Sequence, residues 1–93
     1  MAKTEWFRPT TWDRKVQADF EQRLKRARPE GRPQHLRVAA VTLADTGDPH
    51  FRAAARELLL RLIDECPHDF QVPSAHELLG RYYRLDGQFE EAE

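Results

Sequence analysis

The sequence has few of the residues that cross-link a chain or carry it through a membrane. Its 93 residues include one cysteine, Cys66, so no intramolecular disulfide and no cysteine cluster for zinc can form. The three leucines Leu58 to Leu60 are far shorter than the roughly 20 apolar residues that cross a bilayer. The N-terminus carries no apolar signal-peptide region. These absences predict a soluble cytoplasmic chain that is stabilised by packing alone.

The sequence also has little of what catalysis and metal binding need. Its four glycines are scattered, so there is no glycine-rich loop for a phosphate. No second Cys/His pair at zinc-finger spacing accompanies Cys66 and His68. Cys66 with a histidine is the one conceivable nucleophilic pairing, and nothing in the sequence orients it. We therefore expect no catalytic residue, no bound metal and no cofactor.

What is present suits one small hydrophobic core with a charged surface. Apolar residues make up 40% of the chain and charged residues 33%, with a mean hydropathy of -0.80. Residues 1–37 contain ten Lys/Arg and five Asp/Glu, a net charge of +5. Residues 38–93 contain five Lys/Arg and eleven Asp/Glu, a net charge of -6. The chain is thus basic at its beginning and acidic over the remainder, a pattern typical of solvated helix faces or of an oppositely charged partner.

The N-terminal third predicts one amphipathic helix after a short tail. Residues 1–9 show no periodicity and are interpreted as an anchored tail. Thr10 and Asp13 resemble a capping box, and Pro29 and Gly31 stop the helix that follows. Apolar side chains recur in it at four-residue steps: Trp12, Val16, Phe20 and Leu24. The helix is expected to bury this one stripe and to expose its charged surface.

Two further helices are predicted between residues 33 and 67. Pro33 suits the first turn of a helix that Gly47 ends. Asp48 and Pro49 form a start signal for the next helix, which Pro67 terminates. The apolar residues that mark the buried faces of both helices are Leu36, Ala39, Ala40, Leu43, Phe51, Ala55, Leu58, Leu59, Leu62 and Ile63.

A fourth helix is predicted from the capping box of Ser74 and Glu77. Asp86 and Gly87 then indicate a turn, after which a fifth helix starts at about Gln88. No segment of useful length alternates apolar and polar residues as a strand does. The predicted fold class is therefore all-α, with about five helices.

Residues 76–92 contain a pattern with a family resemblance. They read His76-x-x-Leu79-Gly80-x-x-Tyr83-x-x-x-Gly87-x-Phe89-x-x-Ala92. This resembles a tetratricopeptide repeat (TPR), whose Leu-Gly pair, tyrosine and small residue recur with a period of about 34 residues. His76 departs from the pattern, because tryptophan is typical there. A degenerate copy of the apolar positions begins forty residues earlier, at Leu36.

The resemblance implies antiparallel helical hairpins within a single TPR-like domain over residues 1–93. Residues 10–32 would form an N-terminal capping helix, residues 33–67 a degenerate repeat, and residues 73–93 an incomplete one. Gly80 would let the last two helices approach closely, with Ala92 facing it and Tyr83 between neighbouring units. The resemblance also implies a non-catalytic scaffold that binds a protein or peptide.

The concave surface that this family uses for binding would carry five residues of this sequence. These candidate groove residues are Arg37, Val41, Glu77, Arg81 and Arg84. Guanidinium groups form paired, charge-assisted hydrogen bonds with carboxylates, so the three arginines predict a carboxylate-bearing peptide. The family's lysine and asparagine clamp for C-terminal carboxylates is not supported, because the chain has no asparagine.

Two alternatives concern other partners. Residues 23–32 are basic and could bind nucleic acid, although no aromatic residue interleaves with the charges to stack on bases. A homo-oligomer through residues 73–93 is also predicted, because an incomplete repeat leaves apolar side chains without the cover that stacking provides.

Overall fold

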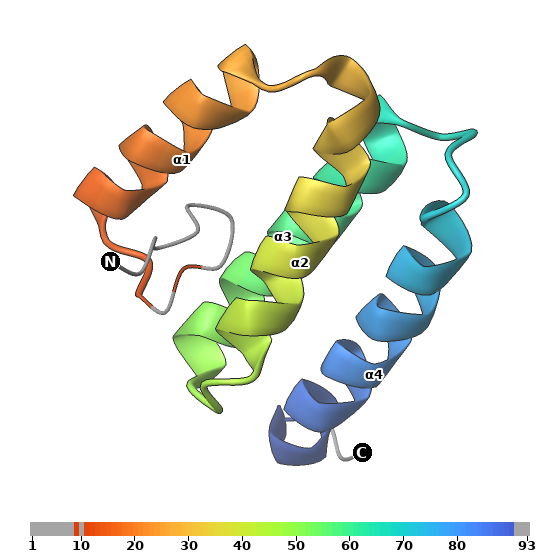
Figure 1. The fold of residues 1–93 in the computed structure, drawn as a ribbon. Helices are drawn as coiled ribbons and strands as arrows, with labels where there is room; N and C mark the ends of the chain where they lie inside the picture. Colours follow the sequence, from red (N-terminus) through yellow and green to blue (C-terminus); the bar gives the residue numbers. More distant parts are fainter. Residues whose placement is uncertain (1–8, 10, 91–93) are drawn as a thin grey trace.

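The part of the chain that the structure describes folds into four α-helices and one short 3₁₀ helix. The computed structural model describes Pro9 and residues 11–90, without the side chains of residues 88–90. The elements are α1 (Arg14–Arg26), η1 (Pro29–Gly31), α2 (Arg32–Ala44), α3 (Pro49–Glu65) and α4 (Val72–Glu90). These described residues contain no strand, so the predicted all-α class is confirmed (Figure 1). None of the described helices is both long and apolar enough to cross a membrane.

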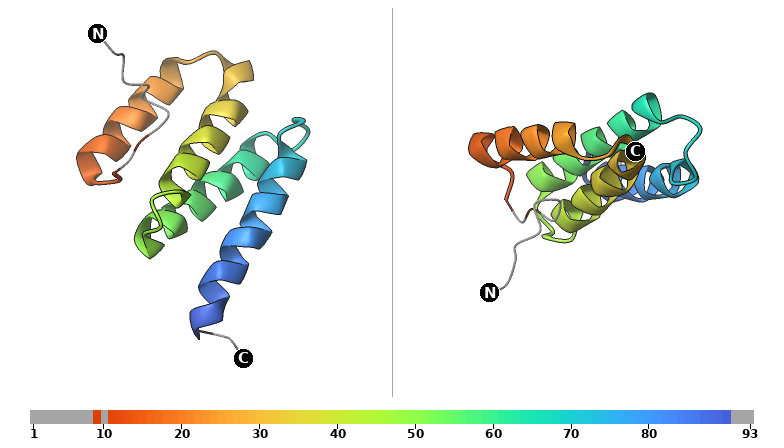
Figure 2. Two further views of the ribbon diagram at one scale, coloured as in Figure 1. Left: turned by 60° about the horizontal axis from the view of Figure 1, so that its bottom comes forward. Right: turned by 45° about the horizontal axis from the view of Figure 1, so that its top comes forward.

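Successive helices reverse direction along the chain. In Figures 1 and 2, α1 and α3 run one way, and α2 and α4 run the other way. Two contacts between distant residues agree with this order. Arg61 of α3 pairs with Glu21 of α1, and Arg37 of α2 donates from Nε to Oε1 of Gln71, the residue before α4, at 2.6 Å.

Local residues fix the beginnings of α1 and α3. The Asp13 carboxylate accepts a hydrogen bond from the Val16 amide at 2.8 Å, which makes Asp13 the residue that caps α1. The sequence predicted Thr10 and Asp13 as a capping box, whereas the structure has Asp13 itself as the N-cap residue. Thr10 lies outside the described residues. Asp48 caps α3 through a 2.8 Å bond from the His50 amide, as the sequence predicts.

The last helix begins earlier and continues further than the sequence predicts. It starts at Val72, so Ser74 lies within its first turn instead of capping it. It continues through Asp86 and Gly87 to Glu90, so the turn expected there does not form. The predicted partner position Phe89 lies in this helix, but its side chain and the whole of Ala92 lie outside the described residues.

A single core joins the four helices. The α2–α3 pair is closely packed because the facing residues Ala39, Ala40 and Ala55 are small and fully buried. Trp12 meets the buried ring of Phe20 edge to face, with 5.5 Å between ring centroids. The other buried apolar residues are Leu24, Leu36, Leu43, Leu58, Leu59, Leu62, Ala75, Leu79 and Tyr82.

Gly80 does not have the role that the TPR resemblance implies. The residue is exposed, and nothing lies within 4 Å of the position that a Cβ atom would take. The predicted close approach at Gly80 is therefore wrong for the described residues. The reason is the continuity of α4: because the helix does not turn back at Gly87, no described helix lies against Gly80.

Candidate binding surfaces

The five groove residues lie on α2 and α4, but they do not form one open surface. Arg37 and Val41 of α2 are half-buried, and the Arg37 guanidinium is held by Gln71. Glu77, Arg81 and Arg84 of α4 are exposed. The exposed cations on this side of the molecule are therefore those of α4, whereas Arg37 joins α2 to the start of α4.

The exposed face of α4 lies opposite its packed face. Ala75, Leu79 and Tyr82 are buried, and helical spacing places Arg81 and Arg84 away from them. The Tyr82 hydroxyl has a raised pKa, first because of burial and then because of the negative charge of Asp45 at the end of α2. The C-terminal end of α2 therefore lies near the middle of α4.

A cluster of two arginines and one aspartate ties the start of α3 to the end of α4. Arg52, whose side chain is 10% exposed, donates from Nε to the Asp86 carboxylate at 2.8 Å. Arg56 pairs with the other oxygen of Asp86 and lies over the Tyr83 ring, 5.0 Å from its centroid. The Asp86 carboxylate is thus paired with α3 at the place where the sequence indicates a turn.

Sequence reasoning missed this cluster, although part of its pattern is local. Arg52 and Arg56 are four residues apart and so share one face of α3. Their common partner, Asp86, lies 34 residues from Arg52 along the chain. Nothing in the local sequence distinguishes an aspartate that begins a turn from one that is paired by another helix.

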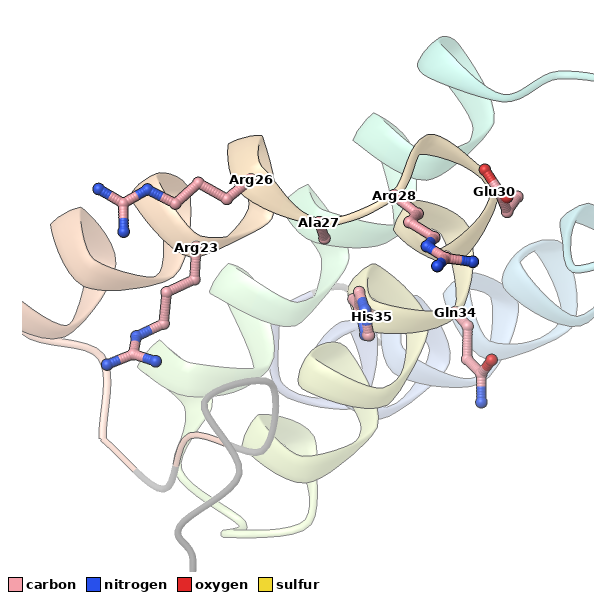
Figure 3. A pocket seen from close by; sticks show the side chains of 8 residues that line it. Arg23, Arg26, Ala27, Arg28, Glu30, Gln34 and His35 are labelled. Carbon is pink, nitrogen blue, oxygen red and sulfur yellow. The ribbon is translucent and has the colours of Figure 1, made fainter.

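A basic hollow occupies the junction of α1, η1 and α2. Its volume is about 690 Å³, and Figure 3 shows the side chains around it. The guanidinium groups of Arg23 and Arg26 lie at one end, that of Arg28 lies toward Gln34, and the His35 ring lies between them. The complete lining is Arg23, Arg26, Ala27, Arg28, Glu30, Gly31, Gln34 and His35. None of the five groove residues contributes to it.

The cations around this hollow differ in their partners. Arg23 is paired with Asp19 through Nε at 3.0 Å, and Arg32, just beyond the hollow, is paired with Glu65 at 3.2 Å. In the described part of the chain, no acidic side chain pairs with Arg26 or Arg28. Burial lowers the pKa of His35, which favours the neutral form of its ring. The exposed guanidinium groups of Arg26 and Arg28 thus lie at opposite ends of the hollow, with the His35 ring between them.

A second hollow of about 490 Å³ lies between α1 and α3. Trp12, Ala53, Ala54 and Leu58 give it an apolar part, and the ion pair of Glu21 and Arg61 stands among its lining residues. Gln17 and Glu57 complete the lining. The pairing of Arg61 with both Glu21 and Glu65 raises its pKa.

The lone cysteine lies where its thiol is protonated. Burial raises the pKa of Cys66, and the nearby carboxylates of Asp69 and Glu65 raise it further. A protonated thiol is a poor nucleophile. Among the described residues, no group of three His, Cys, Asp or Glu side chains is placed to hold a metal ion.

Comparisons with known proteins assign the chain to no family. No family model, no curated protein and no solved structure matches the chain. The structure therefore defines only a general class, an all-α fold whose described residues form four helices that alternate in direction.

Proposed function

We propose that the protein is a non-catalytic, TPR-like interaction module of the cytoplasm that binds a carboxylate-bearing protein or peptide across α2 and α4. The observation that carries the proposal is the order of the helices. The helices α2 and α4 run in the same direction, both opposite to α3, and Arg37 links α2 to the start of α4. This is the order in which stacked helical hairpins present their first helices side by side.

The charges on α4 supply the chemistry for recognition. Arg81 and Arg84 are three residues apart, so they share one exposed face of the helix. In the part of the chain that the structure describes, neither has an acidic partner. Two exposed guanidinium groups on one face suit a carboxylate or a pair of acidic side chains. Glu77, one turn earlier, would disfavour an acidic group at its end of the face.

The support for a TPR-like arrangement comes from the α2–α3 hairpin more than from α4. Ala39, Ala40 and Ala55 allow close packing there, as small residues do between the helices of a hairpin. His76 and Gly80, at the first and the Gly positions of the repeat-like pattern, are both exposed. We therefore propose that α2 and α3 form the packed repeat and that α4 extends the binding surface.

Binding of short acidic peptides tests the proposed function. Fluorescence anisotropy would compare peptides that contain Asp and Glu with counterparts that contain Asn and Gln. We expect the acidic peptides to bind more tightly, and the double variant Arg81→Gln/Arg84→Gln to weaken their binding by about tenfold, since two solvent-exposed ion pairs of about 0.2–1 kcal/mol each contribute up to about 2 kcal/mol together. The matched control is Arg14→Gln/Lys15→Gln, which removes the same charge from the exposed start of α1. Equal losses in both double variants would refute a site on α4.

Nucleic-acid binding through residues 23–32 is the competing function. Two cations of this segment, Arg23 and Arg32, are already paired with carboxylates, which reduces the charge available to a phosphate backbone. Salt separates the two functions, because binding to a polynucleotide weakens steeply as salt is added. A peptide complex held by only two guanidinium groups depends on salt much less.

A further inference from the structure

The hollow between α1 and α3 has the size of a ligand site and a partly apolar lining. Its volume of about 490 Å³ falls within the range of roughly 300–1,000 Å³ that is common for ligand pockets. Leu58, which is 5% exposed, forms the buried part of the lining. Trp12, Ala53 and Ala54 are half-buried and add further apolar surface. Because the Trp12 ring is held against Phe20 by their edge-to-face contact, this surface belongs to the packed part of the molecule.

The order of the polar side chains along this hollow follows from the direction of the two helices. Helices α1 and α3 run the same way (Figures 1 and 2), and Glu21 of α1 is paired with Arg61 of α3. One turn earlier on each helix, Gln17 and Glu57 both line the hollow, so they lie on its two opposite sides. Gln17 donates from Nε2 to the Trp12 carbonyl at 2.9 Å, which leaves its Oε1 atom as an acceptor.

The hollow contains one carboxylate that is not balanced by a cation. Arg61 is engaged by Glu21 through its terminal nitrogens and by Glu65 through Nε at 3.0 Å. Glu57 is exposed and, in the described part of the chain, pairs with no basic side chain. The charge that the hollow offers to a ligand is therefore negative, with the Gln17 oxygen as a second acceptor on the opposite side.

A lysine side chain matches both parts of this lining. Lysine packs its four-carbon stem along apolar surface and keeps its ammonium group in water. The hollow places an exposed carboxylate, Glu57, next in sequence to the buried Leu58, so a ligand with an apolar stem and a cationic head meets both. Acceptors on two sides suit the diverging donors of an ammonium better than the planar fork of a guanidinium.

We propose that the hollow between α1 and α3 binds a lysine side chain of a partner protein, with the ammonium group at Glu57 and the carbon stem against Leu58 and Trp12. The site is separate from the proposed peptide surface on α2 and α4, because none of the candidate groove residues lines this hollow. Each proposal can therefore fail without the other.

Side-chain amide signals in NMR spectra give a local test with internal controls. Gln17 lines the hollow, whereas Gln34 lines the basic hollow and Gln71 is bonded to Arg37. The probe is lysine with blocked α-amino and carboxyl groups, and its comparison is norleucine blocked in the same way, which has the same stem without the ammonium group. We expect blocked lysine to shift the Gln17 signals in a saturable manner and to leave those of Gln34 and Gln71 unchanged. Blocked norleucine should bind about threefold to fivefold more weakly, because it lacks the ion pair with Glu57.

A pair of single variants decides whether Glu57 holds the ammonium group. Glu57→Gln should weaken the binding of blocked lysine by about threefold to fivefold and remove its advantage over norleucine. The matched control is Asp64→Asn, which removes the same charge from an exposed position on the same helix. It should change binding by less than about 1.5-fold, because it lies two turns from Glu57, beyond the Debye length of about 8 Å at physiological ionic strength.

A third variant tests the hollow without changing any charge. Ala53→Leu places a larger side chain at a half-buried position of the lining, so it should weaken the binding of blocked lysine and blocked norleucine alike. Circular dichroism would verify that all three variants remain helical.

Several results would overturn the proposal. It is wrong if blocked lysine leaves the Gln17 signals unchanged, if Glu57→Gln and Asp64→Asn weaken binding equally, or if Ala53→Leu has no effect. Norleucine that binds as tightly as lysine would show an apolar hollow in which Glu57 has no role. Blocked arginine that binds more tightly than blocked lysine would assign the hollow to a guanidinium group instead.

Discussion

Gly47 lies at the turn between α2 and α3 with a φ of 82°, whereas Gly80 lies inside α4 with an ordinary helical backbone. Residues with a side chain rarely adopt a positive φ, so the backbone geometry of this turn requires glycine at position 47. Nothing lies near Gly80, and there the absence of a side chain only raises the entropic cost of forming the helix.

Alanine at these two positions should therefore have opposite effects. Gly80→Ala is expected to raise the free energy of unfolding by about 0.5–1 kcal/mol, through helix propensity. Gly47→Ala is expected to lower it by about 1 kcal/mol, because alanine is strained at positive φ. Urea denaturation of both variants measures the difference. A loss of stability in Gly80→Ala would mean that another segment packs against this residue, as the TPR resemblance implies.

For single residues, the sequence predicted which side chains are exposed better than it predicted their hydrogen-bond and ion-pair partners. Arg81, Arg84 and Glu77 are exposed, as helical spacing indicates. The bond between Arg37 and Gln71 was not predictable, because it joins residues 34 positions apart and depends on how α2 lies against the start of α4. The role of Asp86 was predicted wrongly, since a nearby glycine gives a local turn signal that the arginines of α3 override.

The helices themselves were predictable wherever local chemistry sets their ends. Asp48 with Pro49 starts α3, and α3 ends at Glu65, just before Pro67, as expected from steric restriction before proline. The end of α4 was not predictable in this way. A single glycine costs a helix only about 1 kcal/mol, and the contacts of α4 with α3 can offset such a cost.

Glu65 provides an element-scale prediction, because it joins the end of α3 to the start of α2. It accepts hydrogen bonds from Arg61 at 3.0 Å and from Arg32 at 3.2 Å. Burial alone would raise the pKa of Glu65, but the hydrogen bonds and positive charges of the two arginines outweigh burial and lower it. The stabilisation is therefore complete above the usual carboxyl pKa of 4.5 and is lost as the pH falls through the lowered folded-state value.

We expect Glu65→Gln to lose about 0.5–1 kcal/mol of stability at pH 7, a modest value because solvent screens these partly exposed pairs. At a pH below the pKa of Glu65 in the folded protein, this stabilisation is lost, so the variant and the original protein should have the same free energy of unfolding. Urea denaturation from pH 3 to pH 7 measures this dependence. Glu77→Gln is the control, since Glu77 is exposed and has no basic partner among the described residues. A constant stability difference across the pH range would contradict the assigned role.

For the whole molecule, the uncovered apolar side chains bear on self-association. Tyr83 is 51% exposed, Leu85 39% and Leu60 47%, and Leu60 lies one turn beyond Arg56, which covers the Tyr83 ring. Leu60 and Tyr83 therefore lie on one side of the α3–α4 pair, where another helix would pack in a longer stack. Leu85, two residues after Tyr83, points away from that side. We propose that a second copy covers this side through residues 73–93.

Sedimentation velocity over a range of protein concentrations tests this proposal. The average mass should rise with concentration for the original protein, and Leu60→Gln should shift the rise to higher concentration. Because Leu60 is substantially exposed, the variant should remain folded. A folded monomer at high micromolar concentration would exclude the oligomer.

The alternation of helix direction has a consequence for how quickly the chain folds. The connections between helices are short, and α3 packs against its sequence neighbours α2 and α4, so few of these contacts require the closure of a long loop. Chains with this topology reach the native state within microseconds to milliseconds, because little loop entropy is lost before favourable contacts form. The slowest contact to form should be the pair of Glu21 and Arg61, which closes a loop of 40 residues.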